Sequence, residues 1–171
     1  MAKKKREEGR GDEGKSGKEL KIITFQVITR DKVLANERQV AVLYLVDKFG
    51  PIHEKTLMDL VRNLQELGYD LGYTFTMVGR YPYSPGLKND LTALMYVGFV
   101  ETEPGMYRKL RTTSDGKDAL EKAKVPQGLV DAVNKHFEEL RNKASIIDGE
   151  LDLEIRKRFR ELKRPRRRGF F

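Results

Sequence analysis

The chain has 171 residues, with 34 lysines and arginines against 26 aspartates and glutamates, and a formal net charge of +8. It contains no cysteine, which excludes a disulfide scaffold, a thiolate metal site and a thiol nucleophile. Its longest apolar run, Val40–Val46, has seven residues, whereas a membrane-spanning helix needs about 20. These features predict a soluble cytoplasmic protein of one ordinary domain.

Positive charge is concentrated at the ends of the chain. Residues 1–20 carry a net charge of +2, residues 21–152 carry −1, and residues 153–171 carry +7. A cationic C-terminal run is typical of a segment that binds nucleic acid, because each neutralised phosphate releases condensed counterions. The alternative is a solvated tail or a localisation patch. Residues 1–20 hold too few apolar side chains to fold alone, so we expect a disordered charged tail there.

The first predicted elements are a strand and a helix. Lys21–Arg30 is rich in β-branched and aromatic residues, which predicts a strand. Asn36 can cap a helix that continues through Lys48, because apolar residues recur there at the spacing i, i+3, i+4, i+7. The apolar stripe is wide, which indicates a helix central to the core. Gly50-Pro51 ends this helix.

A second helix precedes a segment rich in aromatic residues. The same apolar spacing predicts a helix from Glu54 to Leu67, and Gly68 stands where a helix often ends. The 15 residues 69–83 include five aromatic side chains. We favour packing of these side chains onto the domain over stacking on nucleic-acid bases.

A third helix and a hairpin follow. Ser84-Pro85 predicts a helix start, since the serine hydroxyl can cap the helix and the proline needs no hydrogen bond there. This helix ends at Gly98. Phe99–Glu103 and Met106–Thr112 then predict two strands of a β-hairpin, joined by a type II turn at Glu103-Pro104-Gly105.

The last element of this region is a short helix from Thr113 or Ser114 to Lys124. The predicted order is therefore three helices, a hairpin and a helix. This order is that of a winged helix, in which the hairpin is the wing and the helix from Ser84 is the equivalent of the recognition helix.

Beyond Pro126 the apolar residues follow alternating steps of three and four, as in a helix that packs against another helix. Asp148-Gly149 interrupts the pattern, so we expect two helices, the second starting at Glu150. We favour a homodimer through these helices over packing against the first helix of the same chain. The residues expected to form the dimer seam are Val130, Val133, Phe137 and Leu140.

The region from residue 40 to residue 124 resembles the winged helix of archaeal and bacterial transcription regulators, in which the corresponding stretch reads roughly "L..L...GLIE…Y.LT..G". The resemblance covers about half of the chain and implies the winged-helix fold, which binds DNA, RNA or protein in different proteins. The residues that carry it are Leu87, Leu91, Leu94, Gly98-Phe99-Val100-Glu101, Tyr107, Leu110, Thr113 and Gly116-Lys117.

A narrower likeness lies just ahead of the third helix. The run Tyr81-Pro82-Tyr83-Ser84-Pro85 is similar to a turn in Panacea-type antitoxin domains, although the glycine of their Gly-Pro pair is missing here. No activity is carried over from those domains. A helix-turn-helix that reads DNA joins its helices by 3–4 residues, whereas 15 residues intervene here. This departure counts against sequence-specific reading and leaves nucleic-acid binding in place.

Candidate nucleic-acid-binding residues fall on four segments. On the predicted recognition helix, Lys88 and Asn89 can contact phosphate or bases. The hairpin carries three cations that either contact phosphate or pair with glutamates of the partner strand, namely Arg108, Lys109 and Arg111. The remaining candidates are Arg80 in the aromatic segment and Arg164, Arg166, Arg167 and Arg168 in the tail.

Together these patterns predict an α+β fold: a winged helix with a three-helix core and a β-hairpin wing, a C-terminal helical extension and basic tails. The expected division is a tail at 1–20, a winged-helix domain at 21–125, C-terminal helices at 126–163 and a basic tail at 164–171. We expect a dimeric DNA-binding transcription regulator, with DNA favoured over RNA, and no membrane contact.

Catalysis is not expected, because neither His53 nor His136 has a nucleophile partner at a recognisable spacing and no phosphate-binding glycine loop is present. No cofactor or metal is expected either. The alternative function is a non-enzymatic protein-interaction adaptor in a ribonucleoprotein or transcription assembly.

Overall fold

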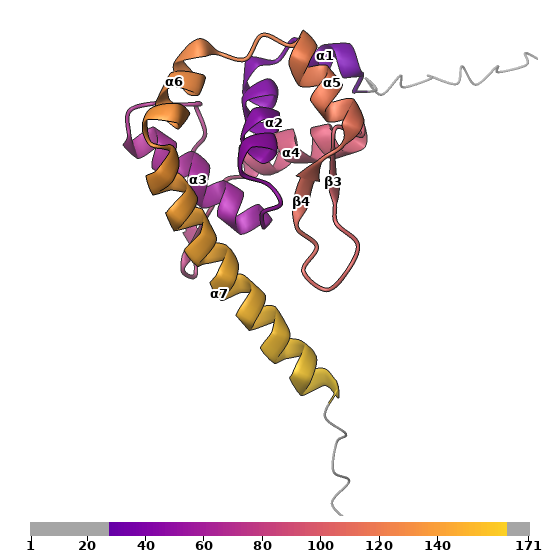
Figure 1. Ribbon diagram of the computed structural model, residues 1–171, viewed down its shortest axis with the longest axis vertical. Coiled ribbons are helices and arrows are strands. Elements are labelled where there is room, and N and C mark those ends of the chain that lie inside the picture. Colours follow the sequence, from indigo (N-terminus) through magenta and orange to yellow (C-terminus); the bar gives the residue numbers. More distant parts are fainter. Residues whose placement is uncertain (1–27, 164–171) are drawn as a thin grey trace, which may run out of the picture.

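The computed structural model describes residues 28–163, which form an α+β arrangement of seven helices and two small antiparallel sheets (Figure 1). The elements in chain order are α1 (Arg30–Leu34), α2 (Glu37–Phe49), α3 (Glu54–Glu66), β1 (Thr76–Val78), β2 (Tyr81–Tyr83), α4 (Pro85–Tyr96), β3 (Val100–Thr102), β4 (Leu110–Thr112), α5 (Ser114–Lys122), α6 (Gln127–Lys135) and α7 (Phe137–Lys163).

The strand predicted at Lys21–Arg30 is wrong at its C-terminal end, and residues 21–27 lie outside the described part. Thr29 caps a short helix, because its hydroxyl accepts a hydrogen bond from the backbone N–H of Lys32. Arg30 is therefore the first residue of α1. The β-branched residues indicated a strand, but the local capping interaction of Thr29 takes precedence at this point.

Helix α2 lies at the centre of the fold, as predicted (Figure 1). Asn36 caps it by accepting a hydrogen bond from the backbone N–H of Arg38 at 3.1 Å. Six of its residues are buried, so its apolar face is wide enough to contact neighbours on several sides. The helix ends at Phe49, directly before Gly50-Pro51.

Helix α3 agrees with its prediction within one residue, and the aromatic segment after it contains a small hairpin. Gly68 follows α3 with a φ of +95°, the left-handed conformation that favours glycine at a helix end. Strands β1 and β2 pair in antiparallel register. Tyr73 is buried and donates a hydrogen bond to Asp90 at 2.7 Å. Burial, together with this bond, raises the pKa of Tyr73, which therefore remains a donor.

Helix α4 begins as predicted, with Ser84 as the cap and Pro85 in the first turn. The β3–β4 hairpin is also confirmed, but β4 begins at Leu110 instead of Met106. The backbone N–H of Glu103 donates to the carbonyl of Lys109 at 2.8 Å, so a loop of seven residues, 103–109, replaces the predicted tight turn. Leu110 also exchanges backbone hydrogen bonds with Ile52, which gives the hairpin a third, one-residue partner.

The C-terminal helices differ from the prediction. The helical structure is interrupted at His136, between α6 and α7, and α7 then continues without interruption from Phe137 to Lys163. Asp148 lies inside this helix as a buried residue. Its carboxylate is satisfied by groups of a distant part of the chain, so it does not terminate the helix. Gly149 faces open space, and a single helical glycine costs only about 1 kcal/mol relative to alanine.

One apolar core joins these elements. Residues of α6 and of the first half of α7 belong to the same buried cluster as α2, α3 and α4. Helix α7 packs along α3 and then continues past the edge of the body, so that its C-terminal part projects (Figure 1). None of the helices in residues 28–163 is sufficiently long and apolar to span a membrane.

Candidate nucleic-acid interface

The two candidates on α4 lie in different surroundings. Asn89 is exposed on the outer face of the helix. Lys88 forms an ion pair with Glu54, at the first turn of α3, with a distance of 2.5 Å between Nζ and Oε2. The carboxylate of Glu54 therefore already neutralises the cation that was expected to contact phosphate or a base.

The three cations of the β3–β4 hairpin also differ in their ion pairing and exposure. Arg111 pairs across the hairpin with Glu101 at 2.8 Å, which is the alternative that the sequence left open. Lys109 is turned toward α7, and only 18% of its side chain is exposed. Arg108 is exposed, and no carboxylate within residues 28–163 pairs with it. Of the three, Arg108 alone is placed as expected for a phosphate contact.

Lys109 belongs to a polar cluster that fastens α7 to the body. Its Nζ lies 2.9 Å from Asp148 Oδ2 and 3.1 Å from Asp152 Oδ2. Asp148 Oδ1 accepts hydrogen bonds from the backbone N–H of His53, at 3.0 Å, and from the hydroxyl of Thr56. His53 Nε2 lies 2.7 Å from Asp152 Oδ1. We refer to these five residues as the α7 clamp.

The electrostatics of the α7 clamp agree with its geometry. Burial lowers the pKa of Lys109, but hydrogen bonds and charge from the two aspartates outweigh burial and hold the pKa above its ordinary value. Burial raises the pKa of Asp152, but hydrogen bonds from His53 and Lys109 outweigh it and lower the pKa. The clamp therefore holds a lysinium between two carboxylates, which is a structural role for Lys109 and not a phosphate contact.

Sequence reasoning did not find the α7 clamp, although one signal for it was present. Asp148 follows Ala144 by four residues and precedes Leu151 by three, so it shares the buried face of α7 with them. A carboxylate on a buried helix face requires partners. The sequence therefore signalled a buried polar contact at the position where we expected a break.

Arg80 is also paired with α7. It lies after β1, in the turn of the β1–β2 hairpin, and its Nη2 is 2.6 Å from Glu154 Oε1. A second carboxylate, that of Glu150, lies 4.0 Å from Arg80 Nη1. Two-thirds of the Arg80 side chain is exposed, so this pair adds little to stability but neutralises the cation locally.

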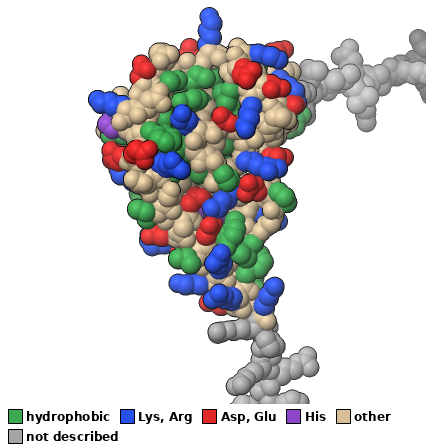
Figure 2. Space-filling view, viewed as in Figure 1, with side chains coloured by type: hydrophobic (Ala, Val, Ile, Leu, Met, Phe, Trp, Pro, Cys, Tyr) green, Lys and Arg blue, Asp and Glu red, His purple; other side chains and the backbone are tan. Residues whose placement is uncertain are grey.

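Unpaired positive charge gathers on the projecting part of α7, residues 154–163, which we call the distal α7 segment. It carries five cations and two glutamates. None of the five is ion-paired with a carboxylate within the described residues, although Arg156 donates a hydrogen bond to the Tyr107 hydroxyl. Cationic side chains surround this end of the molecule in the space-filling view (Figure 2). The five cations are Arg156, Lys157, Arg158, Arg160 and Lys163.

The tail candidates Arg164, Arg166, Arg167 and Arg168 lie outside the described residues. They follow the distal α7 segment directly in the sequence, so the segment and the tail carry consecutive runs of positive charge.

The residues predicted to form a dimer seam are used within the chain. Val133 and Leu140 are buried in the shared core. Phe137 packs against Phe49 of α2, with ring centroids 5.4 Å apart, and Val130 is half-buried. These helices thus contact the body of their own chain, which is the alternative to the favoured dimer.

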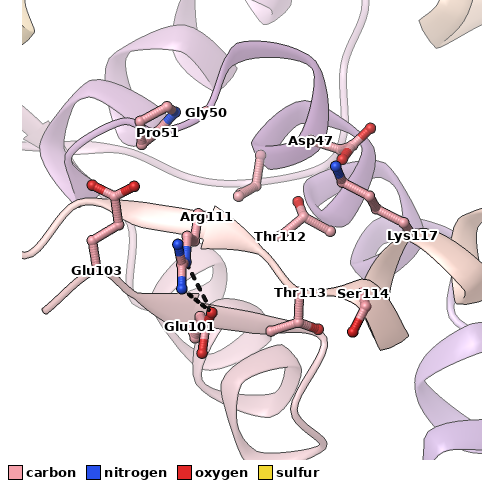
Figure 3. A pocket seen from close by; sticks show the side chains of 11 residues that line it. Asp47, Gly50, Pro51, Glu101, Glu103, Arg111, Thr112, Thr113, Ser114 and Lys117 are labelled. Carbon is pink, nitrogen blue, oxygen red and sulfur yellow. Dashed lines mark hydrogen bonds and ion pairs between the residues drawn. The ribbon is translucent and has the colours of Figure 1, made fainter.

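A polar pocket of about 530 Å³ lies between the end of α2, the β3–β4 hairpin and the start of α5 (Figure 3). Glu103 lies on one side of it, Asp47 and Lys117 lie together on the other side, and the Arg111–Glu101 pair lies between them (Figure 3). Charges of both signs therefore face the pocket without converging on one point. Within residues 28–163, no group of three or more histidines, aspartates or glutamates is arranged to hold a metal ion.

Comparisons of the chain with protein-family models, with curated proteins and with solved structures found no match.

Proposed function

We propose that this chain is a non-enzymatic winged-helix protein that binds nucleic acid, as a DNA-binding transcription regulator does. The element order supports the fold: apart from the β1–β2 hairpin between α3 and α4, the order α2, Ile52, α3, α4 and β3–β4 hairpin is that of a winged helix. In this proposal α4 is the equivalent of the recognition helix and residues 103–109 are the wing.

The observation that carries the proposal is the contrast between paired and unpaired cations. Of the five body cations predicted to bind nucleic acid, four are each ion-paired with a carboxylate, namely Arg80, Lys88, Lys109 and Arg111. On the distal α7 segment, five cations have no such partner among the described residues. Unpaired, exposed cations gain more from a phosphate, because they need not break an existing ion pair. We therefore assign the main phosphate contact to the distal α7 segment and the tail that follows it.

Asn89 and Arg108 have supporting roles in this proposal. Both are exposed, and they stand on the recognition-helix equivalent and on the wing. Two such residues are too few to recognise a DNA sequence of several base pairs by direct contacts with the bases. Binding is therefore expected to be dominated by the backbone, with strong dependence on salt and weak dependence on sequence.

The test is the binding of a fluorescent duplex of random sequence, and of a single-stranded RNA, measured by anisotropy at several salt concentrations. The wild-type chain is compared with the triple variant K157A/R160A/K163A, whose changes lie on the distal α7 segment. The matched control is K122A/K124A/K135A, which removes the same charge from exposed positions of the body. The proposal expects weaker binding in the first variant and nearly unchanged binding in the control.

A protein-interaction adaptor is the second candidate function. It is favoured by the pairing of four candidate cations of the body, since a cation that is already paired with a carboxylate has little attraction for phosphate. Failure of the wild-type chain to bind either duplex or RNA at low salt would decide for the adaptor.

A further inference from the structure

An apolar stripe on the distal α7 segment becomes more exposed toward the C-terminal end of the helix. The buried face of α7, at Leu140 and Leu151, continues along the same side of the helix beyond the body. Ile155, Phe159 and Leu162 follow Leu151 at steps of four, four and three, so they extend this face. Phe159 is 44% exposed and Leu162 is 81% exposed.

The stripe begins in a groove where four parts of the chain meet. The groove has a volume of about 410 Å³ and lies between α7, the start of α3, the end of β2 and the β3–β4 loop. Tyr83, Leu151 and Ile155 supply its apolar lining. Figure 2 shows hydrophobic side chains gathered with cations where α7 leaves the body. The groove and the stripe thus form one continuous apolar surface, which we call the α7 groove.

The charges around the α7 groove are mostly positive. Lys55, Arg108 and Arg158 line it, and none of them is ion-paired with a carboxylate within residues 28–163. Two carboxylates also face the groove, but Glu54 is paired with Lys88 and Glu154 is paired with Arg80. Because the three cations come from α3, the β3–β4 loop and α7, an occupant that carries acidic residues beside an apolar face matches this surface.

A second copy of the chain does not match it. Two distal α7 segments placed side by side would each bring five cations and two glutamates to the interface. Like charges at such positions oppose helix pairing. An acidic partner avoids this repulsion and gains charge complementarity instead.

We propose that the α7 groove binds an amphipathic helix of a partner protein, with an apolar stripe flanked by aspartates or glutamates. This is the helix-in-groove mode, in which anchors at i, i+3 or i+4, and i+7 fill an apolar channel. It goes beyond the proposed function and does not depend on it. Arg156, Arg160 and Lys163 each follow a stripe residue by one position, so they lie about 100° around the helix and remain free for phosphate.

The experiment uses the full chain and a fluorescent synthetic peptide of about 20 residues, enough for five helical turns. The peptide has leucines at helical spacing and glutamates on both flanks. Two control peptides are used: one with lysines in place of the glutamates, and one with the same Leu/Glu composition in scrambled order. The chain variants are F159S/L162S and, as the matched control, I146S/L153S. Ile146 and Leu153 are also exposed on α7 but lie on its opposite face.

The proposal expects the patterned Leu/Glu peptide to bind the wild-type chain and both control peptides to bind at least about tenfold more weakly. F159S/L162S is expected to lower the affinity for the patterned peptide about tenfold or more, whereas I146S/L153S leaves this affinity unchanged. Circular dichroism of both variants is expected to match the wild type, because the replaced side chains lie outside the core. Sedimentation is expected to show no change of subunit number in F159S/L162S.

Four results would overturn the proposal. The first is absence of binding of the patterned peptide, and the second is equal binding of the scrambled peptide, which would indicate attraction by charge alone. The third is a dimer that F159S/L162S converts to a monomer, which would make a second copy the occupant. The fourth is binding to vesicles of phosphatidylserine and phosphatidylcholine that F159S/L162S abolishes while the peptide does not bind, which would indicate a membrane surface.

Discussion

Replacing Asp148 by alanine tests the contact that holds α7 on the body. Asp148 is 8% exposed, and its two carboxylate oxygens have separate partners. Oδ1 accepts from the backbone N–H of His53 at 3.0 Å and from the hydroxyl of Thr56. Oδ2 lies 2.9 Å from Lys109 Nζ. The substitution therefore leaves the His53 N–H and the Thr56 hydroxyl without their acceptor. It also removes one of the two carboxylates that surround the Lys109 ammonium group.

The magnitude follows from these partners. A buried donor left without an acceptor costs about 1–3 kcal/mol. Breaking a buried ion pair costs about 3–5 kcal/mol when a charge is left uncompensated, but Lys109 keeps Asp152 at 3.1 Å. We therefore expect Asp148→Ala to lower the free energy of unfolding by about 3 kcal/mol.

The assay is urea unfolding at pH 7, followed by circular dichroism. Asp118→Ala is the matched control, because Asp118 is exposed on α5 and its replacement is expected to change stability by no more than about 0.5 kcal/mol. Asp148→Asn is expected to fall between the two, since its amide oxygen can still accept from the neutral donors. If Asp148→Ala and Asp118→Ala unfold at the same urea concentration, the reasoning about the α7 clamp is wrong.

Three further outcomes are expected. Folding lowers the pKa of Asp152, so its contribution to stability is present above the unfolded pKa, near 3.9, and is lost as the pH falls through the folded pKa. Asp152→Asn is therefore expected to flatten the decrease of the urea midpoint between pH 5 and pH 3. An unchanged pH profile would contradict this. Tyr73→Phe removes a hydrogen-bond donor from buried Asp90 and is expected to lower the free energy of unfolding by about 1–2 kcal/mol in the same assay. An unchanged free energy of unfolding would show that the hydroxyl is dispensable. Replacing the three arginines at 166–168 by alanine is expected to lower the salt-dependence slope of duplex binding by up to about 3, and a retained slope would remove the tail from the interface.

The sequence predicted the elements whose signals are local. Asn36, Ser84 and Thr113 each cap a helix through a hydrogen bond to a residue two or three positions later, so the residues that start the helix stand together in the sequence. The same holds for the glycine after α3, whose conformation depends on its own backbone. Local chemistry is sufficient to locate such boundaries.

Apart from the local cap at Thr29, two errors occur where distant residues decide the structure. Asp148-Gly149 has the local pattern of a break, but His53 and Thr56, more than 90 positions earlier, satisfy the carboxylate and the helix continues. Arg80 illustrates the same limit at the candidate site. Its charge could be counted from the sequence, whereas its pairing with Glu154, 74 positions away, could not be predicted. The sequence therefore showed which cationic residues are candidates, but it did not show which of them form ion pairs within the chain.

In the proposed function the distal α7 segment, more than α4 and the β3–β4 loop, contacts the phosphate backbone. The most direct measurement is the slope of log affinity against log salt for a random duplex, compared between K157A/R160A/K163A and N89A/R108A. We expect the slope to fall by about 2–3 in the first variant, since each phosphate contact contributes about 0.9, and by no more than about 1 in the second. An unchanged slope in the first variant together with a larger loss in the second would contradict the claim.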